Sequence, residues 1–142
     1  MQDLHNNIHL KRGISPAAAV ADNTAFVSQI VDLAGYDAAE FAILTGALAD
    51  ADATFTTLVE HGDAANLSDA AAVADDQLLG LETQASFLFS DDDKVFKIGL
   101  RTSKRYARVT ITPAANAGNA FIAGVWILGH PRNAPTPNPP RT

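Results

Sequence analysis

The chain of 142 residues contains no cysteine, one methionine and one tryptophan, and aromatic residues make up only 7%. The missing cysteine excludes disulfides, thiolate zinc sites and cysteine nucleophiles. No apolar run approaches the ~20 residues that span a bilayer. The opening segment, residues 1–7, lacks the charged start and apolar middle of a signal peptide, so we expect a protein that is made and kept in a cytoplasm, or assembled there.

Acidic residues are absent after Asp93. Residues 1–93 hold all 16 acids and only two bases, Lys11 and Arg12, whereas residues 94–142 hold eight bases. Such asymmetry marks either a surface that meets a charged partner or neighbouring strands that neutralise one another within one domain.

Patterns typical of catalysis are missing as well. No serine stands in a nucleophile elbow, no glycine-rich loop precedes a helix, and the few glutamates do not form a glycosidase pair. The four histidines are scattered. Aspartate clusters such as residues 91–93 lack the spacing of a calcium loop and are explained by turn formation. We therefore expect no catalytic residue, no metal and no cofactor.

Apolar and polar residues alternate with a period near two, which predicts β-strands. In one segment Phe41 and Ile43 share one face, and Ala42 and Leu44 share the other. The strands expected from this pattern span residues 24–33, 40–48, 53–60, 86–89, 94–101, 105–112 and 119–128.

Turn residues and apolar runs add detail to these strands. The aspartate-rich link at residues 50–52 indicates a hairpin between the second and third strands. Residues 61–80 form either a short helix that Ser68 caps and Gly80 ends, or an alanine-rich loop. Residues 119–128 are apolar on both faces, as in a central strand covered on both sides.

Seven or eight short strands at roughly 8 to 12-residue spacing predict an all-β fold. We expect an antiparallel, jelly-roll-like β-sandwich at residues 14–130, flanked by an N-terminal arm at residues 1–13. Residues 131–142 contain five of the seven prolines and predict an extended C-terminal tail.

Basic residues gather on two consecutive strands. Alternation places Lys97, Arg101 and Arg108 on one outer face, with Lys104, Arg105 and Tyr106 at or near the turn. Three interpretations of these bases remain open. They bind nucleic-acid phosphates while Tyr106 stacks on a base, they pair with acids on a partner protein, or they form a solvated face that faces acidic strands of the same domain. The acidic remainder of the surface disfavours nucleic acid.

Five stretches carry a family resemblance, namely residues 4–7, 49–55, 104–110, 113–119 and 129–135. Together they resemble the small accessory proteins encoded among the head genes of tailed bacteriophages. The resemblance implies a decoration or cement protein that binds the major capsid protein outside an icosahedral shell and bridges capsomers. It also implies a location on the virion after assembly in the host cytoplasm, a dimer or trimer, and no membrane partner.

In this interpretation the arms and the basic strands contact the partner. The expected contact residues are His5, Asn6, Asn7, Lys97, Arg101, Lys104, Arg105, Tyr106, Arg108, His130 and Arg132. Two other classes stay open. One is a carbohydrate- or host-binding sandwich that uses Tyr36, Tyr106 and Trp126 as stacking platforms. The other is a head-completion or tail component that assembles into a ring.

Overall fold

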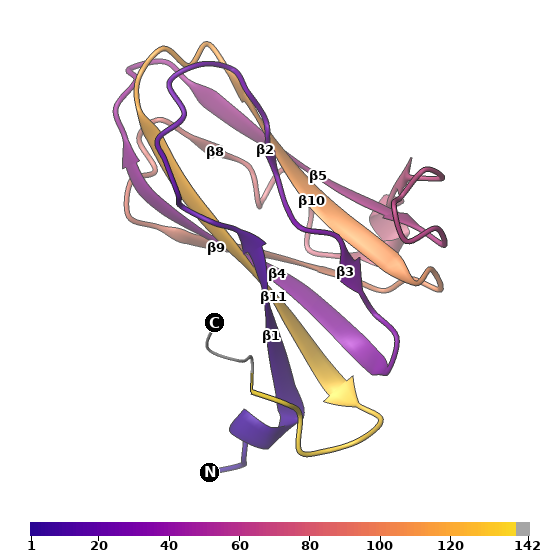
Figure 1. Ribbon diagram of the computed structural model, residues 1–142. Coiled ribbons are helices and arrows are strands. Elements are labelled where there is room, and N and C mark those ends of the chain that lie inside the picture. The colour runs from indigo at the N-terminus through magenta and orange to yellow at the C-terminus, as the bar shows by residue number, and fades with distance from the viewer. Residues whose placement is uncertain (139–142) are drawn as a thin grey trace.

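The computed structural model describes residues 1–138 and consists of two antiparallel sheets that face each other (Figure 1). Sheet A has the strand order β1–β11–β4–β9–β7, and sheet B has the order β2–β10–β5–β6, with β3 also paired to β10 and β8 to β5. The strands are β1 (Ile8–Ile14), β2 (Phe26–Val27), β3 (Val31–Asp32), β4 (Tyr36–Leu48), β5 (Thr54–Gly62), β6 (Ala71–Ala72), β7 (Leu78–Leu79), β8 (Phe87–Leu88), β9 (Val95–Leu100), β10 (Tyr106–Ala114) and β11 (Ala120–Pro131). The expected all-β sandwich is confirmed.

From β4 onward the long strands alternate between the two sheets, as in a jelly roll. The chain passes from β4 in sheet A to β5 in sheet B, and from β9 in sheet A to β10 in sheet B. The expected hairpin across residues 50–52 is therefore wrong, because that link arches between the sheets. Alternation identified the strands but not their partners.

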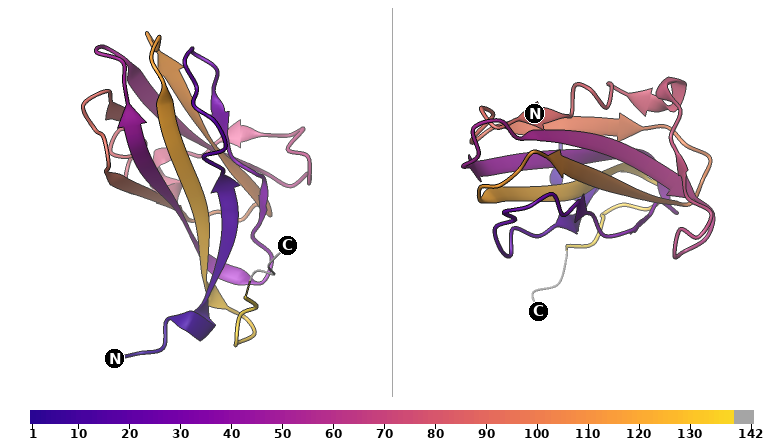
Figure 2. Two further views of the ribbon diagram at one scale, coloured as in Figure 1. Left: turned by 60° about the vertical axis from the view of Figure 1, so that its left-hand side comes forward. Right: turned by 90° about the horizontal axis from the view of Figure 1, so that it is seen from above.

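The core fills the space between the two layers, which Figure 2 shows end-on. Trp126 and Phe41 from neighbouring strands of sheet A are fully buried and meet edge to face, with ring centroids 4.9 Å apart. Phe87 stacks between Phe55 and Phe96, with centroids 5.0 and 5.3 Å away. Aromatic pairs in these geometries add about 0.5–1.5 kcal/mol to the burial of their area.

Two glycines make room for the Phe41 ring. A Cβ on Gly13 of β1 or on Gly124 of β11 would collide with ring carbons of Phe41. Strand β11 pairs directly with β4, and β1 is the next strand in the sheet. The absence of a side chain at these positions therefore allows a large aromatic ring in the centre of the sheet.

Two segments differ from their expected form. Residues 24–33 form two short strands, β2 and β3, and the interruption turns the chain over, since Phe26 and Val31 both reach the core. Residues 61–80 follow the loop alternative, with β6, a 3-10 turn at Asp75–Gln77 (η2) and β7. The alanine run forms no α-helix.

The N-terminal segment also differs, because Ile8–Ile14 is not an arm. It forms the edge strand of sheet A, paired with β11 from Ile8 opposite Gly129 to Ile14 opposite Gly124. Residues 1–7, which include the 3-10 turn His5–Asn7 (η1), precede that strand. The described part of the tail folds back on this segment, since Thr136 is buried and its N–H donates to the Asn6 carbonyl at 3.0 Å. Residues 139–142 of the tail lie outside the described residues.

Candidate docking surface

The outer face of sheet A is unusually apolar. In β4, β9 and β11 the residues that alternate with the buried Phe41, Ile98 and Trp126 point away from the core. We call this outer surface the apolar face. Its apolar residues are Ile8, Leu10, Ala38, Ala42, Leu44, Leu79, Val95, Phe121, Ala123, Val125 and Ile127.

Several of these side chains are open to solvent. Val95 is 69% exposed, Leu44 53%, Leu79 50%, Leu10 42% and Phe121 39%. The solvated face of an antiparallel sheet normally carries polar residues. Large exposed apolar patches on soluble proteins are typical of interaction surfaces.

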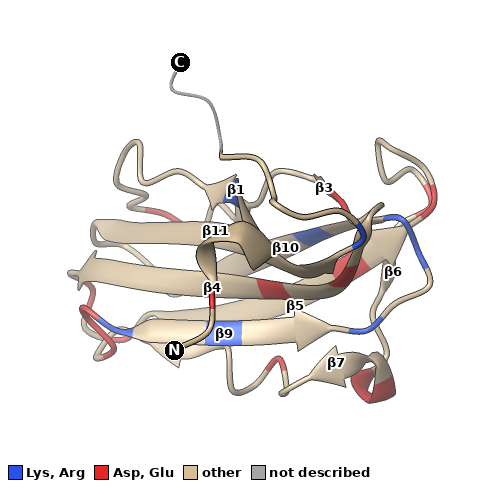
Figure 3. Ribbon diagram, turned by 90° about the horizontal axis from the view of Figure 1, so that it is seen from below, with Lys and Arg blue, Asp and Glu red and all other residues tan. Residues whose placement is uncertain are grey.

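Three charged residues lie among these apolar side chains. Lys97 of β9 lies opposite Ala42 of β4, and Arg12 of β1 lies on the same row, three strands away from Lys97 and opposite Val125. Glu40 lies one row further along, opposite Gly99, where any Cβ would collide with its carboxylate. Figure 3 shows most of the red and blue at the two ends of the sandwich rather than across sheet A.

Glu40 is half-buried, and within residues 1–138 it forms no salt bridge. Burial raises the pKa of Glu40, and the nearby Lys97 charge opposes this rise. The apolar face thus carries an acid and two bases whose charges are not matched by direct ion pairs in the described chain.

A hollow of about 620 Å³ deepens one end of the apolar face. Glu40, Leu79 and Ile127 lie on its sheet side. Leu4 and Asn7 of the N-terminal segment border it, together with His130. The N-terminal segment therefore closes one side of this hollow with Leu4 and with polar residues.

The outer face of sheet B is different. Its strands β5 and β10 present threonines and an ion pair, in which the Arg108 guanidinium donates to the Glu60 carboxylate at 3.2 Å. The outward threonines are Thr54, Thr56, Thr110 and Thr112. On the short flanking strands β2 and β8 this face also exposes Val27 and Leu88, but its two long strands have the polar composition that solvent contact favours.

The expected basic face is wrong, because β9 and β10 belong to different sheets. Lys97 lies on the outer face of sheet A, whereas Arg108 lies on the outer face of sheet B, next to Tyr106 on the same strand face. The two bases cannot act together on one flat surface.

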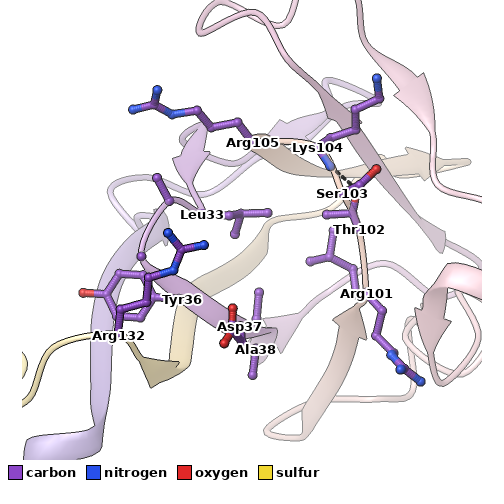
Figure 4. Close-up of a pocket in the computed structure, with 14 residues that line it drawn as sticks. Leu33, Tyr36, Asp37, Ala38, Arg101, Thr102, Ser103, Lys104, Arg105 and Arg132 are labelled. Atoms are coloured by element: carbon purple, nitrogen blue, oxygen red, sulfur yellow. Dashed lines mark hydrogen bonds between the residues drawn. The ribbon is translucent and has the colours of Figure 1, made fainter.

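Four of the expected contact residues do come together at one end of the sandwich (Figure 4). They line an open depression of about 560 Å³, and are Arg101, Lys104, Arg105 and Arg132. The side chains of Arg101, Lys104 and Arg105 point in different directions. Within residues 1–138, Arg101 and Arg132 form no salt bridge.

The other two bases of this depression are neutralised within the domain. Lys104 pairs with Asp63 at 2.7 Å, and Arg105 with Asp32 at 2.9 Å. The guanidinium of Arg105 holds the pKa of Asp32 below its usual value. Together with the Arg108–Glu60 pair, these contacts join bases from the second half of the chain to acids from the first. For these three bases, neutralisation within one domain is the interpretation that the structure supports.

The terminal contact residues lie near the hollow. His5, Asn6 and Asn7 form η1, Asn7 and His130 line the hollow, and the Thr136 hydroxyl donates to the Ile8 carbonyl. The two segments expected to be separate arms thus contact each other. They lie at one end of the outer face of sheet A, which also carries Lys97, whereas Arg108 lies on the opposite outer face.

The aromatic residues considered for sugar stacking do not form a platform. Trp126 is fully buried, and Tyr36 is tied to His9 at 2.6 Å from hydroxyl to Nδ1. Tyr106 lies on sheet B under the Arg105 guanidinium, 5.2 Å from the ring centroid.

Within the described residues there is no cluster of three or more histidine, aspartate or glutamate side chains that could hold a metal. In the same part of the chain no helix has the length and apolarity to span a membrane.

Sequence reasoning missed the apolar face. Its signal is present in residues 119–128, which are apolar on both sides, but that pattern is equally typical of a strand covered within its own domain. The structure buries Trp126 and leaves Phe121, Val125 and Ile127 on an uncovered side. On the edge strand β1, the alternating residues Ile8 and Leu10 carry the same signal.

Comparison with known proteins identifies the fold but no family. No family description and no curated relative matches the chain. Among solved structures, the PBSX exported protein XepA superposes with a TM-score of 0.51 and 15% identity over 91% of this chain. The chain spans 39% of the length of XepA. This similarity shows a shared β-sandwich.

Two further structures superpose less closely. One contains the CBM22-1 and GH10 modules of the Clostridium thermocellum xylanase 10B, with a TM-score of 0.44 and 9% identity over 95% of this chain and 29% of that one. The other is the xylan-binding module CBM15, with a TM-score of 0.42 and 15% identity over 93% of this chain and 96% of that one. Neither similarity bears on function.

Proposed function

We propose that this chain is a structural protein of a virion, a decoration or cement protein that binds the major capsid protein on the outside of a phage shell. In this proposal it performs no catalysis. The observation that carries the assembly role is the exposed apolar face of sheet A, because a solvated sheet face rarely has this composition without a partner. The phage setting rests on the resemblance of the sequence to head-gene accessory proteins.

The basic end of the sandwich is the proposed contact with the shell. Arg101 and Arg132 border an open depression and have no salt bridge within the described residues. Cations of this kind are available to acids on a partner, where they steer association and fix orientation. Lys104 and Arg105 are less available, because Asp63 and Asp32 already neutralise them.

Co-sedimentation with capsids that lack the protein tests the proposal. We expect saturable binding at a fixed ratio to the shell subunit, weakened by salt. Arg101→Gln combined with Arg132→Gln should lower both the affinity and its salt dependence. Lys94→Gln is the matched control, because Lys94 is exposed and already paired with Asp91 at 2.8 Å.

The alternatives give different results in the same assay. Absence of shell binding at every salt concentration would contradict the decoration role. A saturable hit on a carbohydrate array would then favour the host-binding module, and rings in solution would favour a head-completion or tail component. The first alternative lacks a stacking platform, since Trp126 is buried and Tyr36 and Tyr106 lie on different sheets.

A further inference from the structure

We propose that the apolar face pairs with the same face of a second copy of this chain, in a two-fold dimer in which Glu40 of each copy meets Lys97 of the other. This inference rests on the assembly role proposed for the face and names its partner. Dimerisation can be measured without shells, so it stands or fails separately from the decoration role.

The apolar face has the size of a small protein interface. The face is five strands wide, with neighbouring strands about 4.8 Å apart, and extends from Ala38 to Gly46 along β4, with a rise of about 3.4 Å per residue. These spacings give a face of roughly 19 by 27 Å. Two such faces bury on the order of 1,000 Å² in total, which is near the lower bound for a specific interface. The expected dimer is therefore stable but not very tight.

The shape of the face also suits a second sheet. In the centre of the face, on β4, the small residues Ala38, Ala42 and Gly46 alternate with Glu40 and Leu44, and Gly99 and Gly129 lie on the neighbouring strands. Larger side chains border this centre, with Leu10, Val125 and Ile127 toward β1 and Leu79 and Val95 toward β7. A second twisted sheet can approach to about 10 Å over such a centre, in the aligned or orthogonal packing that sandwiches use.

The charges on the face complement each other across a two-fold axis. Glu40 and Lys97 lie on adjacent strands, diagonally one row apart, without a salt bridge between them. A two-fold axis makes every contact reciprocal, so one alignment of Glu40 with Lys97 of the second copy yields two ion pairs. A half-buried carboxylate in an apolar surface gains most from such a partner, because burial already raises its pKa.

A second copy fits better than an unrelated surface because the face contains both members of the pair. A capsid surface would need its own base opposite Glu40 and its own acid opposite Lys97. A copy of the same chain provides both in the required spacing.

Sedimentation equilibrium over about 1–500 µM tests the dimer, a range that brackets the affinity of small interfaces. We expect the unmodified chain to dimerise, and Glu40→Lys and Lys97→Glu each to weaken the dimer at least tenfold, since like charges then face each other twice. An equimolar mixture of the two variants should dimerise again, because opposite charges face each other at both contacts only in the mixed pair. Thr56→Lys on the outer face of sheet B is the matched control and should leave the affinity unchanged.

Thermal unfolding of each variant checks that the fold is intact. Three outcomes would overturn the dimer: an unmodified chain that stays monomeric over the whole range, a mixture that shows no recovery, or equal weakening by Thr56→Lys. A monomeric chain that loses shell binding with Glu40→Lys would instead assign the apolar face to the capsid protein. Loss of shell binding with an intact dimer would contradict only the decoration role.

Discussion

The two outer faces of the sandwich are built on equally good strands but carry opposite chemistry. Sheet B presents threonines and the Arg108–Glu60 pair, with Val27 and Leu88 exposed on its short flanking strands, whereas sheet A presents leucines, valines and isoleucines on most of its outward positions, with three charges among them. Inward positions of both sheets are fixed by the need to bury a core. Outward positions are not, so an apolar outer face reflects a need other than folding. We infer that this need is contact with a partner.

The largest expected effect separates the two sides of one strand. Trp126→Ala removes a fully buried indole and should lower the free energy of unfolding by about 3–5 kcal/mol. Val125→Thr, on the outer side of the same strand, should change it by less than about 1 kcal/mol in dilute protein. Urea denaturation measures both. Equal losses in the free energy of unfolding would mean that the outer side of β11 stabilises the monomer as much as its inner side does.

The next effect compares the two outer faces directly. Leu44→Lys places a charge among exposed apolar residues of sheet A and should weaken self-association at least tenfold, because a desolvated lysine has no partner there. Thr56→Lys on sheet B should leave it unchanged. Light scattering after size-exclusion chromatography gives the mass of each variant. A dimer that tolerates Leu44→Lys would place its interface on another surface.

A smaller effect concerns the pH dependence of the acid on the apolar face. Burial raises the pKa of Glu40, so its ionised form disfavours the folded monomer. The resulting loss of folding stability is absent below the ordinary pKa of a glutamate and appears as the pH rises through the raised pKa of Glu40. In the monomeric Leu44→Lys background, Glu40→Gln should therefore stabilise the fold slightly at pH 7 and have no effect near pH 3. Thermal unfolding at the two pH values tests this, and a destabilised variant at pH 7 would be the opposite result.

The smallest effect lies on sheet B. The Arg108–Glu60 pair is partly exposed, with side-chain exposures of 28% and 18%. Pairs near the surface contribute about 0.2–1 kcal/mol. A double-mutant cycle with Arg108→Ala and Glu60→Ala should give a coupling free energy in this range, with no change in self-association. A change in dimer affinity would show that sheet B also contacts the second copy.

Much of the fold could be predicted from alternation, because burial on one side of a strand imposes a period of two. The inward sides of β4, β5, β9 and β10 follow that period as expected, for example at Phe41, Ile98 and Val109. The pairing of strands could not be predicted, because alternation fixes a face but not a neighbour. This is why alternation groups Lys97 with Arg108, whereas the structure separates them.

The candidate site could be predicted only in part. Arg101, Lys104, Arg105 and Arg132 do share one depression, although two of them are neutralised by Asp63 and Asp32. The apolar face escaped prediction because an apolar strand has the same sequence whether a domain or a partner covers its outer side. Only the uncovered position of β11 distinguishes the two.

The chain has no cysteine, so a single introduced thiol reports on one face alone. The central claim is that a partner covers the outer face of sheet A, and the rate of maleimide labelling of Ala42→Cys tests it most directly, with Thr110→Cys on sheet B as the control. We expect labelling at position 42 to slow as the protein concentration passes through the dimer range, while labelling at position 110 stays constant. A labelling rate at position 42 that changes neither with protein concentration nor on addition of capsids would contradict the claim.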